Sequence, residues 1–182
     1  MGTLCIGCEL AGKNVELLGF GAIAQSVAKK LKGFDINILA YDKYPDLDKA
    51  REIGVNIVSF EDVLKDSDIV SLHVPSIKET YHIIGEAQFS MMKDGAYFIN
   101  TARGALVDQN ALYNALKWKK LRGAAVDVYE QEPTKSDNPL FELDNIVCTP
   151  QNAAETYEAY TAIGISTAQG IIDVLEGRIP EN

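Results

Sequence analysis

Two glycines directly after an apolar run are the first residues whose spacing could bind a ligand. The run Asn14–Leu18 reads as a strand, and Gly19-Phe20-Gly21-Ala22-Ile23-Ala24 follows it where a helix is expected to begin. Gly19 permits a tight turn, Gly21 lets the backbone approach a phosphate, and Ala24 allows the helix to pack closely on the strand. Unpaired N–H groups at the start of that helix favour an anion, so the segment predicts a dinucleotide site, although a turn without function can have the same residues. The predicted contacts of this turn are Gly19, Gly21, Ala22 and Ile23.

A carboxylate at the end of the second predicted strand, Ile36–Tyr41, supports this interpretation. Asp42 lies 21 residues beyond Gly21, where its oxygens can accept hydrogen bonds from the hydroxyl groups of an adenosine ribose. The same negative charge repels a 2′-phosphate, so the sequence favours NAD over NADP, and the neighbouring Lys43 weakens that preference slightly. An aspartate that is merely solvated at a strand end is the alternative.

Other unusual residues also follow predicted strands. Because the carboxyl ends of parallel strands meet at one edge of a sheet, and ligands of open α/β sheets bind there, these residues are expected to share one rim with the glycine turn. They are His73 and Pro75 after strand 69–72, Arg103 after strand 96–99, Asp127 after strand 124–126, and Gln151 after strand 146–148.

Apolar runs alternate with amphipathic stretches along the whole chain. Besides the strands already given, one is expected at 55–58, and helices are expected at 23–32 before Gly33, at 46–52 before Gly54, after Ser59, at 108–116 and at about 155–176. Strands that are apolar on both faces, with helices between them, indicate an α/β fold with a doubly wound, mostly parallel sheet in three layers. No linker divides the chain, so one domain over residues 1–182 is expected.

The composition limits the classes of partner. The 17 Lys and Arg against 26 Asp and Glu give a net charge of −9, which argues against a nucleic-acid partner because phosphate contacts need clustered basic residues. No window approaches the roughly 18 apolar residues of a membrane span and no secretory signal is recognised, so a cytoplasmic protein without a membrane partner is expected. Cys5, Cys8 and Cys148 are expected to be reduced, and they are too few for a zinc site, so no metal is predicted.

Taken in order, the motifs resemble those of the D-isomer-specific 2-hydroxyacid dehydrogenases, from about residue 7 to residue 182. Besides the glycine turn they are Leu72-His73-Val74-Pro75, Met92-Lys93-Asp94-Gly95-Ala96, Asn100-Thr101-Ala102-Arg103-Gly104, Val107-Asp108, Ala125–Pro133 and Thr149-Pro150. The resemblance implies a Rossmann-type NAD-binding domain and hydride exchange between NAD and a small 2-hydroxy or 2-keto acid. It also implies a homodimer formed through the cofactor domain, with Tyr97, Tyr113 and Trp118 as candidate interface aromatics.

The resemblance also gives individual residues a role. Arg103 matches the substrate-binding arginine, whose planar fork suits a carboxylate and can polarise the adjacent carbonyl. Glu132 matches the carboxylate that partners the family's catalytic histidine, and Asp127 matches the residue that orients the nicotinamide carboxamide. His82 is expected to be structural. The implied cofactor contacts beyond the first turn are Asp42, His73, Val74, Pro75, Thr101, Ala102 and Asp127.

The chain departs from the family pattern after Thr149-Pro150, where Gln151 stands in place of the acid–base histidine. An imidazolium can protonate the nascent alkoxide, whereas glutamine can hydrogen-bond the same oxygen but exchanges no proton near neutral pH. Loss of such help typically costs on the order of 10²- to 10⁴-fold in rate, so turnover is in doubt while cofactor binding is not. The alternatives are a catalytically impaired or non-catalytic NAD sensor or interaction protein, and an active enzyme in which water or another side chain donates the proton.

Length is the second departure. Family members carry a substrate domain built largely from residues ahead of the cofactor domain, whereas the fingerprint strand begins here at Asn14. The chain is therefore expected to be an isolated cofactor domain, with a lead-in at about 1–13 and, at 177–182, a return segment toward a missing substrate domain. In a cleft open to water, Arg103 would hold a substrate weakly.

Overall fold

The computed structural model of this chain describes residues 7–180, which fall into two compact units that meet in sequence after Pro150. The first unit extends to Pro150 and the second begins at Gln151. The expectation of a single domain over 1–182, with its lead-in and return segments, stays a prediction.

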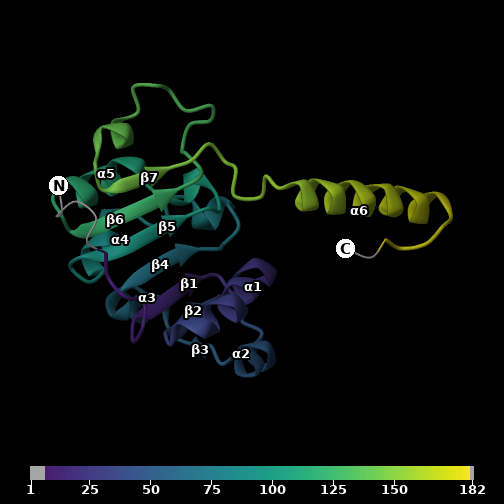
Figure 1. Ribbon diagram of the computed structural model, residues 1–182, viewed down its shortest axis with the longest axis horizontal. Helices are drawn as coiled ribbons and strands as arrows, with labels where there is room; N and C mark the ends of the chain where they lie inside the picture. Colours follow the sequence, from purple (N-terminus) through teal and green to yellow (C-terminus); the bar gives the residue numbers. More distant parts are fainter. Residues whose placement is uncertain (1–6, 181–182) are drawn as a thin grey trace. The chain divides into compact units, whose positions relative to one another are not determined.

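Seven strands of the first unit form one sheet in the order β3-β2-β1-β4-β5-β6-β7, and every neighbouring pair runs parallel (Figure 1). This confirms the doubly wound, Rossmann-type α/β fold. The strand order reverses between β1 and β4, which is where ligands bind in sheets of this kind. The strands are β1 (Asn14–Leu18), β2 (Asn37–Tyr41), β3 (Asn56–Ile57), β4 (Ile69–Leu72), β5 (Ala96–Asn100), β6 (Leu121–Val126) and β7 (Ile146–Cys148).

Helices cover the two faces of the sheet unequally. Leu17 and Leu18 of β1 point to opposite faces, and each belongs to a different apolar cluster. The cluster around Leu17 contains the buried side chains of α1 and α2, whereas the cluster around Leu18 contains those of α3, α4 and α5. The helices of this unit are α1 (Ala22–Leu31), α2 (Leu47–Ile53), α3 (Phe60–Asp66), α4 (Glu86–Met91) and α5 (Gln109–Lys117), with short 3₁₀ turns η1 (Lys32–Phe34), η2 (Lys78–Thr80), η3 (Gly104–Leu106) and η4 (Pro139–Glu142).

Half of the face that carries α1 and α2 is covered by no helix of the described part of the first unit, residues 7–150. Over β4 to β7 this half is a groove of about 560 Å³ whose lining comes from strands and connecting segments. Ile69, Tyr97, Ile99 and Ala125 line it and are only half-buried, and Val147 is 63% exposed. We call these five residues the bare face. Parallel sheets are normally covered on both sides, so at the bare face the sheet lacks its usual apolar covering.

Capping side chains start the helices where the sequence indicates. Ser59 caps α3 by accepting a hydrogen bond from the Asp62 N–H, and Asp108 caps α5 by accepting from two backbone N–H groups. Gly54 ends α2 with φ 77°, as predicted. The predicted end of the first helix, at about Lys32, is one residue beyond the observed end at Leu31. The prediction that Gly33 is the stop is wrong, because the chain continues through Gly33 in η1 and turns left-handed only at Asp35, with φ 52°.

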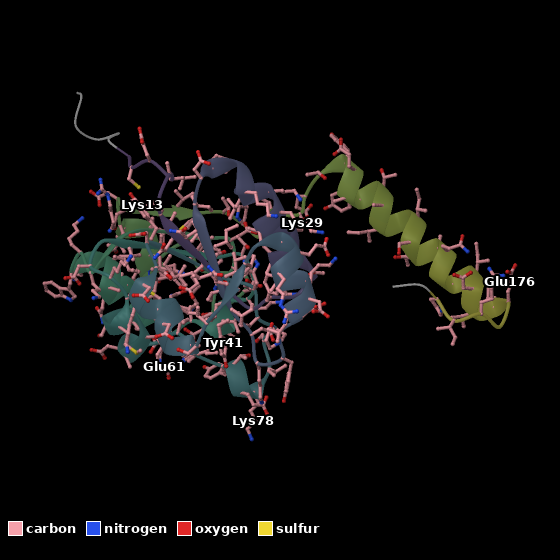
Figure 2. All side chains as sticks on the ribbon, turned by 90° about the horizontal axis from the view of Figure 1, so that it is seen from below. Lys13, Lys29, Tyr41, Glu61, Lys78 and Glu176 are labelled. Atoms are coloured by element: carbon pink, nitrogen blue, oxygen red, sulfur yellow. The ribbon has the colours of Figure 1, made fainter. Side chains whose placement is uncertain are left out.

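The second unit contains one long helix, α6 (Tyr157–Leu175), close to the predicted bounds. Thr156 caps it by accepting a hydrogen bond from the Ala159 N–H, and none of its side chains is buried. After the helix, Arg178 forms ion pairs with Asp173 and Glu176, the latter labelled in Figure 2. Within residues 7–180, no helix combines the length and the apolar content that crossing a membrane requires.

Candidate functional site

The parallel order of the strands brings the predicted site residues of the first unit to one edge of the sheet. They lie in the segments that follow the carboxyl ends of strands, and the seven strands point the same way. The edge therefore carries Gly19 after β1, Asp42 after β2, His73 after β4, Thr101 to Arg103 after β5, Asp127 after β6 and Thr149 after β7.

The first turn of this edge needs both of its glycines, for different reasons. Gly19 has φ 103°, and a Cβ there would lie 2.7 Å from the carbonyl carbon of His73, so a side chain would collide with the end of β4. At Gly21 a Cβ would meet no other atom of residues 7–180 within 4 Å. Ala24 is fully buried against the sheet. Gly19 is thus required by the fold, while the space above Gly21 is open to a ligand.

Asp42 ties the first turn to the second strand. Its Oδ2 accepts a hydrogen bond from the Phe20 N–H at 2.8 Å, and its Oδ1 accepts one from the Tyr44 N–H at 2.9 Å. Each carboxylate oxygen has a further lone pair, so both can also accept from ribose hydroxyls.

A hollow of about 480 Å³ opens between the ends of β4 and β5, beside the start of α1. His73 lies in it with its Nε2 3.1 Å from the Ser71 Oγ, and burial lowers the pKa of this imidazole, which favours the neutral ring. Ser76 belongs to the hollow although sequence reasoning did not select it. The lining residues are Ile23, Leu72, His73, Val74, Pro75, Ser76, Thr101, Ala102 and Arg103.

Arg103 lies on a short loop that a buried amide shapes. The Asn100 Nδ2 donates to the Arg103 carbonyl at 2.9 Å, and its Oδ1 accepts from the Ala102 N–H at 3.0 Å. Sequence reasoning did not give Asn100 this role, although a polar residue ending a buried strand was a usable signal. Within the described part of the chain, the exposed Arg103 donates one guanidinium hydrogen bond, from Nη1 to the Ala102 carbonyl at 2.6 Å, and a guanidinium has five N–H donors. The rest of the fork can therefore meet an anion.

Asp127 and Thr149 are joined at the ends of β6 and β7. Asp127 is only 4% exposed, and its Oδ1 accepts a hydrogen bond of 2.5 Å from the Thr149 Oγ1. The Thr149 N–H continues the ladder by donating to the Val126 carbonyl at 3.0 Å. Nearby, the exposed Glu132 accepts a hydrogen bond from the Tyr129 N–H through Oε1, at 2.9 Å.

Gln151 opens the second unit and is described there alone, with a left-handed φ of 55°. The described geometry therefore brings together the segments of Arg103, Asp127 and Glu132, all in the first unit, but not Gln151. Its place beside Arg103 and Glu132 stays a prediction.

His82 pairs with Glu130 at 2.7 Å and stacks on Tyr81 with ring centroids 4.0 Å apart. Its backbone N–H donates to the Ala105 carbonyl at 2.9 Å, so the residue connects two loops. These contacts agree with the structural role predicted for His82. Among residues 7–180 no group of three or more potential ligands could hold a metal ion, and Cys5 lies outside them.

A comparison with protein families shows which family the chain belongs to. The family model "D-isomer specific 2-hydroxyacid dehydrogenase, NAD binding domain" matches residues 3–153. The chain belongs to this family. The matched part is the NAD-binding domain of enzymes that act as NAD-dependent dehydrogenases, so the expectations of family, cofactor class and fold are confirmed.

Individual relatives agree with this assignment. The chain is 45% identical to the D-3-phosphoglycerate dehydrogenase of Archaeoglobus fulgidus, over 94% of this chain and 33% of that protein. It is 44% identical to the glyoxylate reductase of Thermococcus litoralis, over 97% of this chain and 53% of that protein. The D-lactate dehydrogenase of Lactobacillus jensenii, solved with NAD⁺, superposes with a TM-score of 0.90 at 30% identity, covering 100% of this chain and 58% of that one. The chain thus spans about a third to a half of the curated relatives it matches.

Proposed function

We propose that this chain binds NAD(H) across the carboxyl edge of its sheet, as the cofactor domain of an oxidoreductase that acts on a small 2-hydroxy or 2-keto acid. The observation that carries the proposal is the open space above Gly21, next to the carboxylate of Asp42 and on the same edge of the sheet as the hollow at His73. NAD supplies hydride exchange at its nicotinamide ring when bound.

The residues divide along the edge according to the chemistry of a dinucleotide. Gly19, Gly21, Ala22 and Ile23 would hold the pyrophosphate with the N–H groups at the start of α1, and Asp42 would accept from the adenosine ribose. Since Asp42 fixes the adenosine end over β2, the nicotinamide end extends toward β4 to β7. There it would meet His73, Val74, Pro75, Thr101, Ala102 and Asp127.

The proposed reaction depends on the positive charge of Arg103, while Glu132 loses the partner that it has in the family. Arg103 would bind the substrate carboxylate with its guanidinium fork. Gln151 would hydrogen-bond the reacting oxygen without supplying a proton, so Glu132 would have no imidazole to orient. We therefore expect slow turnover from this chain even when NADH binds.

An NADH titration followed by nicotinamide fluorescence tests the cofactor proposal. We expect saturable binding that ADP-ribose displaces, and weaker binding of NADPH because the Asp42 carboxylate repels the 2′-phosphate. Asp42→Asn should narrow the difference between NADH and NADPH. The matched control is Asp46→Asn, a helix cap on the next segment, which should leave the NADH-to-NADPH ratio unchanged. Absence of saturable NADH binding would remove the proposal.

A second candidate function, favoured by Gln151, is an NAD-binding sensor or interaction protein without catalysis. The chain and its Gln151→His variant are compared for oxidation of NADH with glyoxylate, pyruvate or hydroxypyruvate. A rise of roughly 10²-fold or more in the variant supports a dehydrogenase that lacks only its acid. Background rates in both, together with tight NADH binding, favour the sensor.

We also propose that the domain self-associates. Support comes from the bare face, which includes Tyr97, one of the aromatics selected from the sequence, and which leaves Val147 63% exposed. Trp118 is 75% exposed at the end of α5, whereas Tyr113 is only half-exposed. Of these three aromatics only Tyr97 belongs to the bare face, so Tyr97 is the one that we expect in the interface.

A further inference from the structure

Tyr129 follows β6 and contacts three of the segments that carry the proposed chemistry. Its backbone N–H donates to the Glu132 Oε1 at 2.9 Å, and its hydroxyl donates to the Thr149 carbonyl at 3.0 Å. Its own carbonyl lies against Gly104, where a Cβ would come within 1.8 Å of that oxygen. Gly104 directly follows Arg103, so a single residue touches the arginine loop, the glutamate loop and the end of β7.

The Tyr129 ring holds these contacts in place because it is buried. The residue is 8% exposed, and its ring packs edge-on against Phe141 with centroids 5.8 Å apart. Burial, chiefly, and the neighbouring Cys148 thiol raise the pKa of Tyr129 to about 12. The hydroxyl consequently stays protonated and remains a donor throughout the neutral range.

The hydroxyl acts on Thr149, and Thr149 acts on Asp127. The Thr149 carbonyl accepts from Tyr129, while the Thr149 Oγ1 donates to the Asp127 Oδ1 at 2.5 Å. Both polar ends of Thr149 are thus fixed, and the Asp127 carboxylate is fixed with them. By the strand order, these groups lie on the half of the edge opposite Asp42.

We propose that Tyr129 is a positioning residue, whose hydroxyl holds Thr149 and through it orients Asp127 toward the nicotinamide end of the cofactor. This rests on the proposed function, since it assumes that the dinucleotide extends from Asp42 toward β6 and β7. Tyr129 itself does not need to touch the cofactor.

The test compares Tyr129→Phe with the unchanged chain in the binding of two ligands, NADH and ADP-ribose. ADP-ribose shares the adenosine and pyrophosphate parts but has no nicotinamide. Loss of one hydroxyl donor should weaken NADH binding by about 3- to 10-fold and leave ADP-ribose binding within about twofold. A purely structural role would weaken both ligands equally.

Two further variants keep the test decisive. Thr149→Val removes the hydroxyl that meets Asp127 at nearly constant shape, and it should reproduce the selective loss of NADH affinity. Tyr81→Phe removes a tyrosine hydroxyl from an exposed residue that contacts Glu130, and it should change neither affinity.

The outcomes separate this inference from the proposed function. If the unchanged chain binds neither ligand, the proposed function fails and the inference falls with it. If the unchanged chain binds both, an equal loss for both ligands in Tyr129→Phe, or no loss for either, overturns the positioning role alone.

Discussion

Glu16 lies in the middle of the inner strand β1, fully buried, and within residues 7–180 neither of its carboxyl oxygens has a hydrogen-bond partner. Burial, first, and then the nearby Asp66 and Asp62 of α3 raise the pKa of Glu16 from 4.5 to about 8. The folded domain therefore holds a neutral carboxyl at pH 7, in contact with the apolar side of the sheet.

This residue predicts how stability depends on pH. The unfolded chain releases the Glu16 proton near pH 4.5 and the folded chain releases it near pH 8. The free energy of unfolding should therefore decrease as the pH rises from 4.5 to 8. The slope contributed by this residue is about 1.4 kcal/mol per pH unit. Thermal melts of the chain and of Glu16→Gln from pH 5 to 9 measure it, and the variant should lack this part of the slope. Identical slopes would contradict the burial argument.

Single residues also mark how far sequence reasoning reaches. Asp42 could be selected because it ends the second strand 21 residues beyond Gly21, and Arg103 and Asp127 because each follows a strand and matches a family motif. Tyr129 could not, since its hydroxyl bond to Thr149 joins residues 20 apart in sequence through the pairing of β6 and β7. The burial of Glu16 could not be predicted either, because a charged residue in a strand is normally expected to face solvent.

At the scale of elements, the two glycines of the turn between β1 and α1 are expected to have different roles, Gly19 in stability and Gly21 in cofactor binding. Gly19→Ala places a Cβ at φ 103° and 2.7 Å from the carbonyl carbon of His73. It should lower the free energy of unfolding by about 2 kcal/mol or more, which is several degrees of Tm. Gly21→Ala meets no protein atom within 4 Å, so its stability should change by less than about 1 kcal/mol.

The effect on NADH binding should be the reverse: among folded molecules, Gly21→Ala should lose more NADH affinity than Gly19→Ala. A methyl group at Gly21 occupies the space where the pyrophosphate would approach, so NADH affinity should fall by roughly tenfold or more in a fully folded protein. Calorimetric melts together with NADH titrations check both quantities. A folded Gly21→Ala variant with normal NADH affinity would show that the phosphates bind elsewhere.

The elements themselves were largely predictable. The strands 69–72 and 146–148 and the caps Ser59 and Asp108 are found where the pattern indicates, because two-sided apolar runs and side-chain caps are local signals. The six-residue helix α4 is too short to show a helical period. The start of β6 was predicted too late: the strand begins at Leu121, but the exposed Arg122 interrupts its apolar run in the sequence. The order of the seven strands in the sheet depends on contacts between distant segments, which no single window of the sequence contains.

At the scale of the whole molecule, the unequal covering of the sheet predicts self-association through the bare face. Val147→Lys adds a charge at a site that is already 63% exposed, so it should leave the fold intact and shift the chain toward monomer in sedimentation equilibrium. Trp118→Lys, a change of the same kind at a residue outside the bare face and 75% exposed, is the matched control and should leave association unchanged. A chain that is monomeric at all concentrations, or that responds only to Trp118→Lys, would contradict the assignment of this face.

We propose that an extended nicotinamide dinucleotide binds along one edge of the sheet. The most direct test of this proposal is a titration of the ¹⁵N-labelled chain with NAD⁺, followed by the movement of backbone amide signals in NMR spectra. We predict that the shifted amides cluster at the carboxyl ends of the strands, with Phe20, Gly21 and Asp42 at the adenosine end and Thr101 and Asp127 toward the nicotinamide end. Unchanged spectra, or shifts confined to the groove lined by Tyr97 and Val147, would contradict the claim.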